Sequence, residues 1–234
     1  MLADVVIQPA EELALQFARI AEDAALRAIA ARGSFSIAVP GGSAAERLLP
    51  ALVPTSIDWA KTEVFWVDER RVPPDDARSN FRLAQAAWLD RVAVPPERVH
   101  RMRGEDTAPG AAEAYARLLR ERLGEPARVD LVLLGVGEDG HVASLFPGHR
   151  LLRAWDRDVA TLDDAPKPPP GRVTLTLRAL TAARQLVVFA TGPAKAEAIR
   201  EVLSNPESDL PLALATMGDG PATFLLDDAA RGPR

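Results

Sequence analysis

The chain has 234 residues, of which 47% are hydrophobic, with a formal net charge of −5 and no cysteine. This length suits one large α/β domain or two small ones, and we expect a single domain over residues 1–234. The lack of cysteine excludes disulfides, thiolate catalysis and cysteine-based zinc sites. The acidic balance argues against general nucleic-acid binding, which usually shows a basic stripe.

The N-terminal stretch MLADVVIQPAEE has no basic segment followed by an apolar one, so it does not resemble a secretory signal. No apolar run in the chain reaches the roughly 18 residues that a membrane helix needs. We therefore expect a cytoplasmic protein that binds neither membranes nor nucleic acid. We also expect it to be a monomer.

The first helix is expected over residues 10–32, because Leu13, Phe17, Ile20 and Ala24 recur at helical spacing and Gly33 follows. The next elements alternate between strand and helix. In chain order we expect a strand at 34–40, a helix from 44, a strand at 64–69, helices at 79–92 and 110–123, strands at 129–137, near 158–163, at 173–177 and at 186–190, a helix at 193–203 and a strand at 222–227.

Several of these strands are apolar throughout, which is typical of strands buried on both faces. Together with the alternation of strand and helix, this predicts an α/β fold: a mostly parallel, Rossmann-like open sheet with helices on both faces. In such sheets, ligands bind at the carboxyl ends of the strands. Four loops are expected at that edge: PGGS (40–43), DERRV (68–72), GVGEDGH (135–141) and TGPAK (191–195).

Two of these loops lead from a strand into a helix. In PGGS, Gly41 and Gly42 let backbone amides approach a ligand, the helix N-terminus favours an anion, and Ser43 adds a hydroxyl. In TGPAK, Pro193 suits the first helical position, and Lys195 opposes the helix dipole unless an anion lies nearby. A plain tight turn and a solvated lysine are the alternatives. Both loops at one sheet edge favour a phosphate site.

DERRV places Asp68 and Arg70 directly after an apolar strand. Arginine binds carboxylate or phosphate through two parallel hydrogen bonds. A surface cluster of ion pairs is the commoner explanation for such a run. The position after the strand VFWV favours a site.

GVGEDGH ends on His141, whose imidazole suits proton transfer near neutral pH. Asp139 is placed to orient this ring or to set its tautomer. One alternative is a loop histidine bonded to a carbonyl group. Another is a metal site of Asp139, His141 and His149, although no familiar ligand spacing such as HExxH is present.

These segments resemble the 6-phosphogluconolactonase family, the lactone hydrolases of the oxidative pentose phosphate pathway. The matching stretches are PGGS, FWVDERRVPPDDARSNF, DLVLLGVGEDGHVASLFPG, PPPGRVTLTL and VVFATGPAKAEAIREVL, which run in the family's order from residue 36 to about 203. Two departures stand out. The family's Ser-Gly-Gly-Ser-Thr-Pro is here Pro40-Gly-Gly-Ser-Ala44-Ala, and Val142 replaces the threonine of DGHTASLFP.

The resemblance implies hydrolysis of 6-phospho-D-glucono-1,5-lactone to 6-phospho-D-gluconate, without a metal or an organic cofactor. His141 is expected to activate water as a general base and then to protonate the ring oxygen, with Asp139 holding the imidazole. The oxyanion would be met by backbone amides around Gly140 or by Arg70. These two possibilities remain open from the sequence.

The remaining expected contacts concern the substrate, a small sugar phosphate lactone. Its phosphate would be bound by Gly42, Ser43, Lys195 and Arg172, with Gly41 allowing the backbone to approach. Asp68 and Asn80 would bond the sugar hydroxyls.

Two alternatives remain for the function. Glucosamine-6-phosphate deaminase has a similar loop, DGHIAFNEPG, whose glutamate assists ring opening, but Phe146 stands at that position here. A non-catalytic sugar-phosphate sensor would normally carry a DNA-binding segment, and no basic helix is evident. A sensor could also lose the histidine that this chain keeps.

Overall fold

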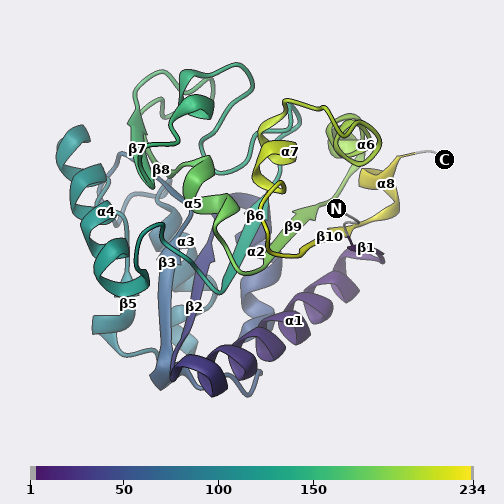
Figure 1. Cartoon of the computed structure of the whole chain (residues 1–234). Coiled ribbons are helices and arrows are strands. Elements are labelled where there is room, and N and C mark those ends of the chain that lie inside the picture. The colour runs from purple at the N-terminus through teal and green to yellow at the C-terminus, as the bar shows by residue number, and fades with distance from the viewer. Residues whose placement is uncertain (1–3, 233–234) are drawn as a thin grey trace.

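The computed structural model describes residues 4–232, built on a seven-stranded parallel sheet (Figure 1). The strand order is β1-β10-β9-β6-β2-β3-β5. These strands are β1 (Asp4–Ile7), β2 (Phe35–Val39), β3 (Thr62–Trp66), β5 (Val99–His100), β6 (Leu131–Gly135), β9 (Leu186–Ala190) and β10 (Ala222–Leu226). The expected α/β class with a parallel sheet is confirmed.

Helices cover both faces of this sheet. The eight α-helices of the described residues are α1 (Ala10–Arg32), α2 (Gly42–Leu48), α3 (Asn80–Ala87), α4 (Ala108–Leu123), α5 (Leu177–Thr181), α6 (Ala196–Ser204), α7 (Pro211–Ala215) and α8 (Asp228–Arg231). The chain steps in one direction from β1 to β2, β3 and β5, then in the other from β6 to β9 and β10. Because such crossovers are right-handed, the two sets of helices lie on opposite faces. In keeping with this, α2 packs against α1 and α3, while α5 packs against α7.

A second, smaller sheet holds β4 (Asp68–Arg70), β8 (Arg172–Leu175) and β7 (Val159–Leu162), in that order and antiparallel. The expected single strand at 64–69 is therefore wrong in part. The chain leaves the parallel sheet after Trp66, and Asp68 begins pairing with β8. Strands β7 and β8 do not join the parallel sheet, because the loop 163–171 between them contains no helix to make a parallel crossover.

Other expected boundaries shift slightly. The helix expected at 79–92 ends at Ala87 and is followed by a 3-10 turn, and the one expected at 193–203 begins as a 3-10 turn before α6. The short edge strands β1 and β5 were not expected. The 3-10 turns are Leu49–Leu52, Trp59–Lys61, Leu89–Arg91, Pro96–Arg98, Arg150–Arg153 and Pro193–Lys195.

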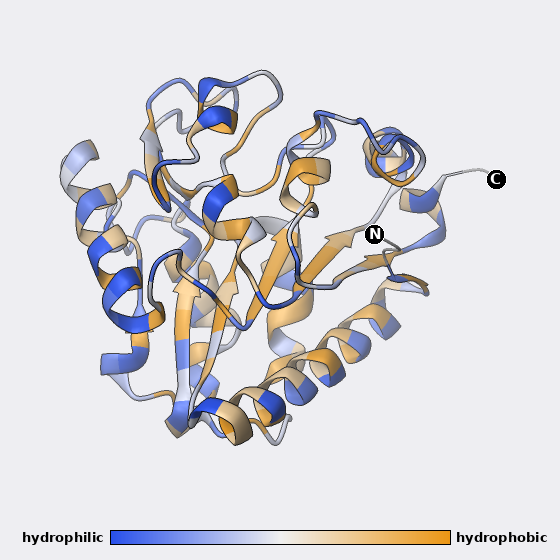
Figure 2. Ribbon diagram, viewed as in Figure 1, coloured by the Kyte–Doolittle hydropathy of each residue, from blue (hydrophilic) through white to orange (hydrophobic). Residues whose placement is uncertain are grey.

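One hydrophobic core joins the two sheets and the helices packed on them. Figure 2 shows the strands of the parallel sheet as mostly hydrophobic, while α1 carries hydrophobic and polar residues around its circumference. Along α1 the buried residues include Leu13 and Phe17, and Gly33 closes the helix in a left-handed conformation (φ 79°). Within residues 4–232, no helix combines the length and the apolar character required to cross a bilayer.

The sheet order reverses between β2 and β6. From β2 the chain proceeds to β3 and β5 on one side, and from β6 to β9 and β10 on the other. Such a reversal leaves a crevice beyond the carboxyl ends of the two strands, where ligands of open α/β sheets bind. The loops that follow β2 and β6 are PGGS and GVGEDGH.

Candidate active site

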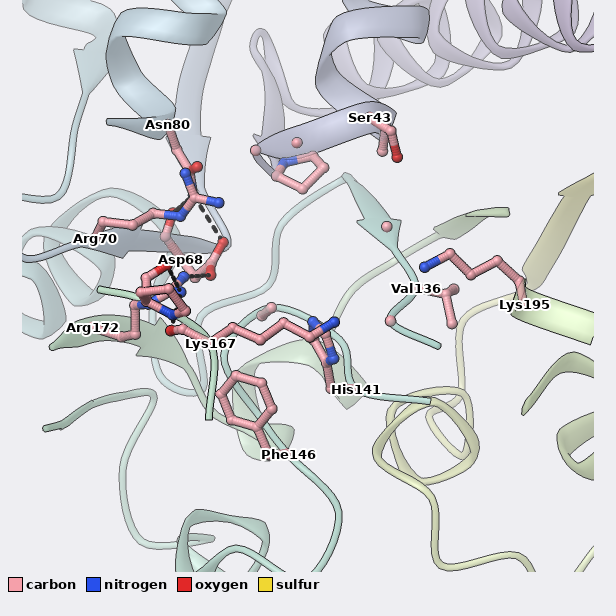
Figure 3. A pocket seen from close by; sticks show the side chains of 18 residues that line it. Ser43, Asp68, Arg70, Asn80, Val136, His141, Phe146, Lys167, Arg172 and Lys195 are labelled. Carbon is pink, nitrogen blue, oxygen red and sulfur yellow. Dashed lines mark hydrogen bonds and ion pairs between the residues drawn. The ribbon is translucent and has the colours of Figure 1, made fainter. Parts of the chain in front are cut away.

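A cavity of about 300 Å³ lies at this reversal point (Figure 3). All the predicted site residues except Asp139 and Gly140 line it. The fold thus brings together four loops that are far apart in the sequence. The cavity is lined by Pro40, Gly41, Gly42, Ser43, Ala44, Asp68, Arg70, Asn80, Gly135, Val136, Gly137, His141, Ala143, Phe146, Lys167, Pro168, Arg172 and Lys195.

His141 and Asp139 form a hydrogen-bonded pair at the edge of the cavity. Nδ1 of His141 lies 2.5 Å from Oδ1 of Asp139, and the backbone amide of His141 donates to the same oxygen at 3.3 Å. An ionised carboxylate can only accept, so Nδ1 carries the proton and Nε2 has a free lone pair. Among the described residues Nε2 has no hydrogen-bonding partner. This is the tautomer that a general base requires.

The turn that presents His141 is fixed by its backbone and by a glycine. Gly137 N donates to His141 O at 2.8 Å, and Gly140 N donates to Gly137 O at 3.1 Å. A Cβ on Gly137 would lie only 1.9 Å from Nδ1 of His141, so any side chain there would displace the ring. The ring of Phe146 packs against the imidazole, with the two ring centroids 4.8 Å apart. Gly140 adopts a positive φ of 79° that closes the turn.

The surroundings of the pair favour the neutral base. Burial lowers the pKa of His141 below its ordinary value; Asp139 opposes this effect, and the positive charge of Lys167 adds to it. Partial burial works against ionisation of Asp139, but the hydrogen bonds and charge of His141 outweigh it and lower the pKa of Asp139. At neutral pH the imidazole is therefore largely unprotonated beside an ionised carboxylate.

A buried network around Asp68 forms one side of the cavity. Asn80 Nδ2 donates to Asp68 O at 2.9 Å and to Asp68 Oδ1 at 3.1 Å, while Ser144 Oγ donates to Asp68 Oδ2 at 2.6 Å. Asn80 Oδ1 is buried and accepts no hydrogen bond within residues 4–232. A Cβ on Gly41 would overlap this oxygen at 1.8 Å, so the glycine is needed for the packing of Asn80. The network presents fixed polar groups to a ligand.

Glu69, which was not among the predicted site residues, holds this side of the site in place. Its buried carboxylate accepts from the backbone amides of Asn80 and Phe81, at 2.7 and 2.8 Å, and from Ser79 Oγ at 3.0 Å. These donors belong to the N-terminus of α3, where helix amides have no partner within the helix. Glu69 thereby links β4 to α3 and positions Asn80. The adjacent Ser79 also caps α3, because its side chain accepts from the amide of Arg82.

Arg172 and Arg70 occupy paired positions on β8 and β4. Arg172 is buried and donates to the carbonyl groups of Pro169 at 2.8 Å, Lys167 at 3.0 Å and Pro168 at 3.4 Å. Its Nη1 lies 4.0 Å from Asp68 Oδ2. Arg70 donates to Arg78 O at 2.6 Å. Figure 3 shows both arginines beside Asp68, on the side of the cavity away from Lys195.

The opposite side of the cavity presents Ser43 and Lys195 (Figure 3). Gly42 begins α2 with a positive φ of 61°, and Lys195 lies at the N-terminal end of α6. Partial burial lowers the pKa of Lys195, with Glu138 opposing this effect. Four cationic side chains thus line the cavity against one carboxylate, Asp68. The site favours an anionic ligand despite the net negative charge of the chain.

Lys167 is the one charged side chain of the cavity that was not predicted to belong to the site. It lies in the proline-rich loop DDAPKPPPG (163–171), for which no role was predicted. One signal was available: the chain has only three lysines, and this one stands five residues before Arg172. Its position over the cavity depends on the pairing of β7 with β8, which the sequence pattern does not reveal.

The proposed metal alternative does not assemble. Nε2 of His149 bonds Asp164 at 3.1 Å, and Nδ1 of His149 accepts from Leu151 N, so this histidine has other partners. In the part of the chain that the structure describes, no group of three metal-ligating side chains occurs.

The two departures from the family pattern fall in different environments. Val142, which replaces the family's threonine, is fully buried and does not line the cavity, so its side chain does not face a ligand bound there. Ala44 does line the cavity, next to Ser43. Because Ala44 lacks the hydroxyl of the family's threonine, Ser43 and the backbone are the polar groups of this loop.

Comparison with known proteins shows the family of this chain. The family model described as glucosamine-6-phosphate isomerases/6-phosphogluconolactonase matches residues 8–224. The human 6-phosphogluconolactonase is 40% identical over 96% of this chain and 91% of its own length. A probable chloroplastic 6-phosphogluconolactonase of rice (Oryza sativa subsp. indica) is 36% identical over 97% of this chain and 75% of its own.

Similarity extends to solved structures. The 6-phosphogluconolactonase of Trypanosoma brucei superposes with a TM-score of 0.85 at 27% identity, covering 98% of this chain and 97% of that one. The fold and the sequence matches therefore agree. The chain belongs to the glucosamine-6-phosphate isomerase/6-phosphogluconolactonase family.

Proposed function

We propose that this protein hydrolyses 6-phospho-D-glucono-1,5-lactone to 6-phospho-D-gluconate. The observation that supports this most strongly is the His141–Asp139 pair, which presents an unpartnered Nε2 to a cavity lined by four cations. Hydrolysis of a phosphorylated lactone needs a base that activates water and positive charges that bind the phosphate. The names of the human and rice relatives point to the same reaction.

In the proposed mechanism, Nε2 of His141 removes a proton from water as the water oxygen attacks the lactone carbonyl carbon. The resulting tetrahedral intermediate collapses with cleavage of the bond to the ring oxygen, which takes the proton back from His141. Asp139 holds the ring and stabilises the imidazolium between these two steps. General acid–base help of this kind contributes roughly 10²–10⁴-fold.

The substrate is expected to lie across the cavity. We expect Ser43, Lys195 and the backbone around Gly42, which line the cavity at the start of α2, to bind the phosphate. Asp68 and Asn80 are placed to bond sugar hydroxyls on the other side. Arg172 was also expected to bind phosphate, but its bonds to three loop carbonyls favour a different role.

Aminosugar deamination is the second candidate within this family. The related deaminase loop has a glutamate where this chain has Phe146, and Phe146 packs against the ring of His141. With an apolar ring in this position, no acid is available there to assist ring opening. Cytoplasmic location and the monomeric state remain predictions, and the rice relative is named as chloroplastic.

The test is lactone hydrolysis above the spontaneous rate, with lactone made fresh by glucose-6-phosphate dehydrogenase. Wild type should accelerate hydrolysis, and His141→Ala should lose roughly 10²–10⁴-fold in kcat/KM. His149→Ala is a matched control, because His149 also bonds an aspartate but lies outside the cavity. It should keep wild-type activity.

Full activity in His141→Ala would reject the assigned base while keeping the enzyme class. Turnover of glucosamine 6-phosphate with release of ammonia would favour the deaminase. Binding of 6-phosphogluconate without turnover of either substrate would favour a sensor.

A further inference from the structure

The loop 163–171 forms a strap along one side of the cavity, and several contacts attach it to the rest of the protein. Arg172 binds three of its carbonyl groups, and Ala165 N donates to Pro170 O at 3.2 Å. Outside the strap, Arg71 forms an ion pair with Asp163, and Arg71 N donates to Gly171 O at 2.9 Å. The backbone that carries Lys167 is therefore held in place without any ligand.

The side chain of Lys167 extends from this strap toward His141 (Figure 3). Within residues 4–232, no carboxylate lies within ion-pairing distance of its ammonium group, and no hydrogen bond to it is formed. Lys167 is an exposed residue that also lines the cavity, so its ammonium group is free to meet an anionic group there. Lys195 also lines the cavity, but it lies on the side of Ser43.

The two oxyanion donors considered from the sequence are less well placed. The amide of Gly140 already donates to Gly137 O, and the amide of His141 donates to Asp139. Arg70 donates to Arg78 O through Nη1, and its buried Nε has no partner among the described residues, but the guanidinium group lies beside Asp68, on the far side of Figure 3 from Lys195. Neither group is free and close to His141 at once, whereas Lys167 is both.

We propose that Lys167 is a catalytic residue whose ammonium group stabilises the oxyanion formed at the lactone carbonyl and then binds the carboxylate of the product. This inference rests on the proposed lactonase function. It separates the two lysines of the cavity: Lys167 binds the reacting carbonyl end, and Lys195 binds the phosphate.

The step balances without any further reagent. Water gives its proton to His141, its oxygen bonds the carbonyl carbon, and the carbonyl electron pair moves onto the oxygen that faces Lys167. That pair then re-forms the carbonyl as the bond to the ring oxygen breaks, and the ring oxygen takes the proton from His141. The carboxylic acid so formed loses its proton to solvent and remains beside the ammonium group.

The experiment compares Lys167→Met with Lys195→Met, using two ligands that share a 6-phosphate. One is 6-phosphogluconate, which has a carboxylate at C1, and the other is glucitol 6-phosphate, which has a hydroxyl there. Lys167→Met should weaken binding of 6-phosphogluconate at least 10-fold, while the affinity for glucitol 6-phosphate should stay within about twofold of wild type. Lys195→Met should weaken both. Lys61→Met is the control, because Lys61 is exposed and paired with Asp58.

In turnover, Lys167→Met should lower kcat by roughly 10²–10³-fold with little change in KM. The acid limb of its residual activity should move to higher pH, since loss of this positive charge raises the pKa of His141. Lys167→Arg should recover part of kcat. A purely structural role would change neither the pH limb nor the ligand preference.

The proposal is overturned if Lys167→Met weakens the two ligands equally, which would make Lys167 a phosphate ligand, or if kcat is unchanged. If wild type shows no lactone turnover, the proposed function fails. The two-ligand comparison then still decides whether Lys167 recognises a carboxylate.

Discussion

Asp139 holds His141 by two bonds to a single oxygen, one from the ring at 2.5 Å and one from the backbone amide at 3.3 Å. The carboxylate thus fixes both the turn and the orientation of the imidazole. The pair is more than a charge contact, because the same atom determines which ring nitrogen faces the cavity. Two substitutions can separate these effects. One removes the charge of Asp139, and the other adds a side chain at Gly137 that displaces the imidazole.

Asp139→Asn should lower kcat/KM by roughly 10²-fold or more, because the amide can hold the wrong tautomer and does not stabilise the imidazolium. The pH profile should shift as well. In wild type, activity is lost as pH falls through the pKa of His141, which burial places below its ordinary value and Asp139 partly restores. Without that restoring charge the pKa falls further, so the acid limb of Asp139→Asn should lie at lower pH. Measurement of kcat/KM from pH 4.5 to 8 tests this.

Asp164→Asn is the matched control, since Asp164 bonds His149 outside the cavity. Its profile should overlay that of wild type. An acid limb of Asp139→Asn at higher pH than wild type would contradict the assigned pair.

Gly137→Ala should inactivate the protein while leaving it folded. The added Cβ would lie 1.9 Å from Nδ1 of His141 and 2.5 Å from Oδ1 of Asp139, so the pair must separate. We expect a loss in kcat/KM of the size seen on removing the imidazole, with a small change in the midpoint of thermal unfolding. Gly110→Ala in α4 is the control, because its Cβ would meet only the Thr107 hydroxyl. Wild-type turnover in Gly137→Ala would show that the pair tolerates displacement.

Local sequence patterns were sufficient to predict the five inner strands of the parallel sheet and the loops at its carboxyl edge. The helix over residues 10–32 was predicted correctly because its apolar spacing is long and its end is marked by Gly33. The resemblance to the family then indicated His141 and Asp139. What escaped prediction depends on tertiary pairing: the break after Trp66 occurs because β4 pairs with β8, more than 100 residues later in the chain.

The same reason explains the residues that were missed. Glu69 caps a helix that begins eleven residues later, and Lys167 reaches the cavity because Arg172 binds the strap. Neither contact produces a periodic pattern in the local sequence. The antiparallel pairing of β7 with β8 could have been predicted from the sequence. Strands joined by a loop as short as 163–171, without a helix, cannot be parallel neighbours.

Glu69→Gln should destabilise the protein by about 1–3 kcal/mol, because the amide group brings a donor into a site where four donors already converge. The loss should extend to function, since Asn80 N is among those donors and Asn80 lines the cavity. We expect KM to rise more than kcat falls. Chemical denaturation and steady-state kinetics measure the two effects.

Glu113→Gln serves as the control, as Glu113 is exposed on α4. Its stability should remain within about 0.5 kcal/mol of wild type. A Glu69→Gln protein as stable as wild type would mean that the N-terminus of α3 finds other acceptors.

Arg172→Gln distinguishes the role expected from the sequence from the one that its contacts favour. If Arg172 binds phosphate, the variant should bind 6-phosphogluconate and glucitol 6-phosphate more weakly by the same factor. Because Arg172 instead binds the carbonyl groups of the strap, we expect a fall in kcat with nearly unchanged affinity for glucitol 6-phosphate. Combination with Lys167→Met should be non-additive, since both changes act through one ammonium group. Additive losses in kcat would show that Arg172 acts on the substrate independently of the strap.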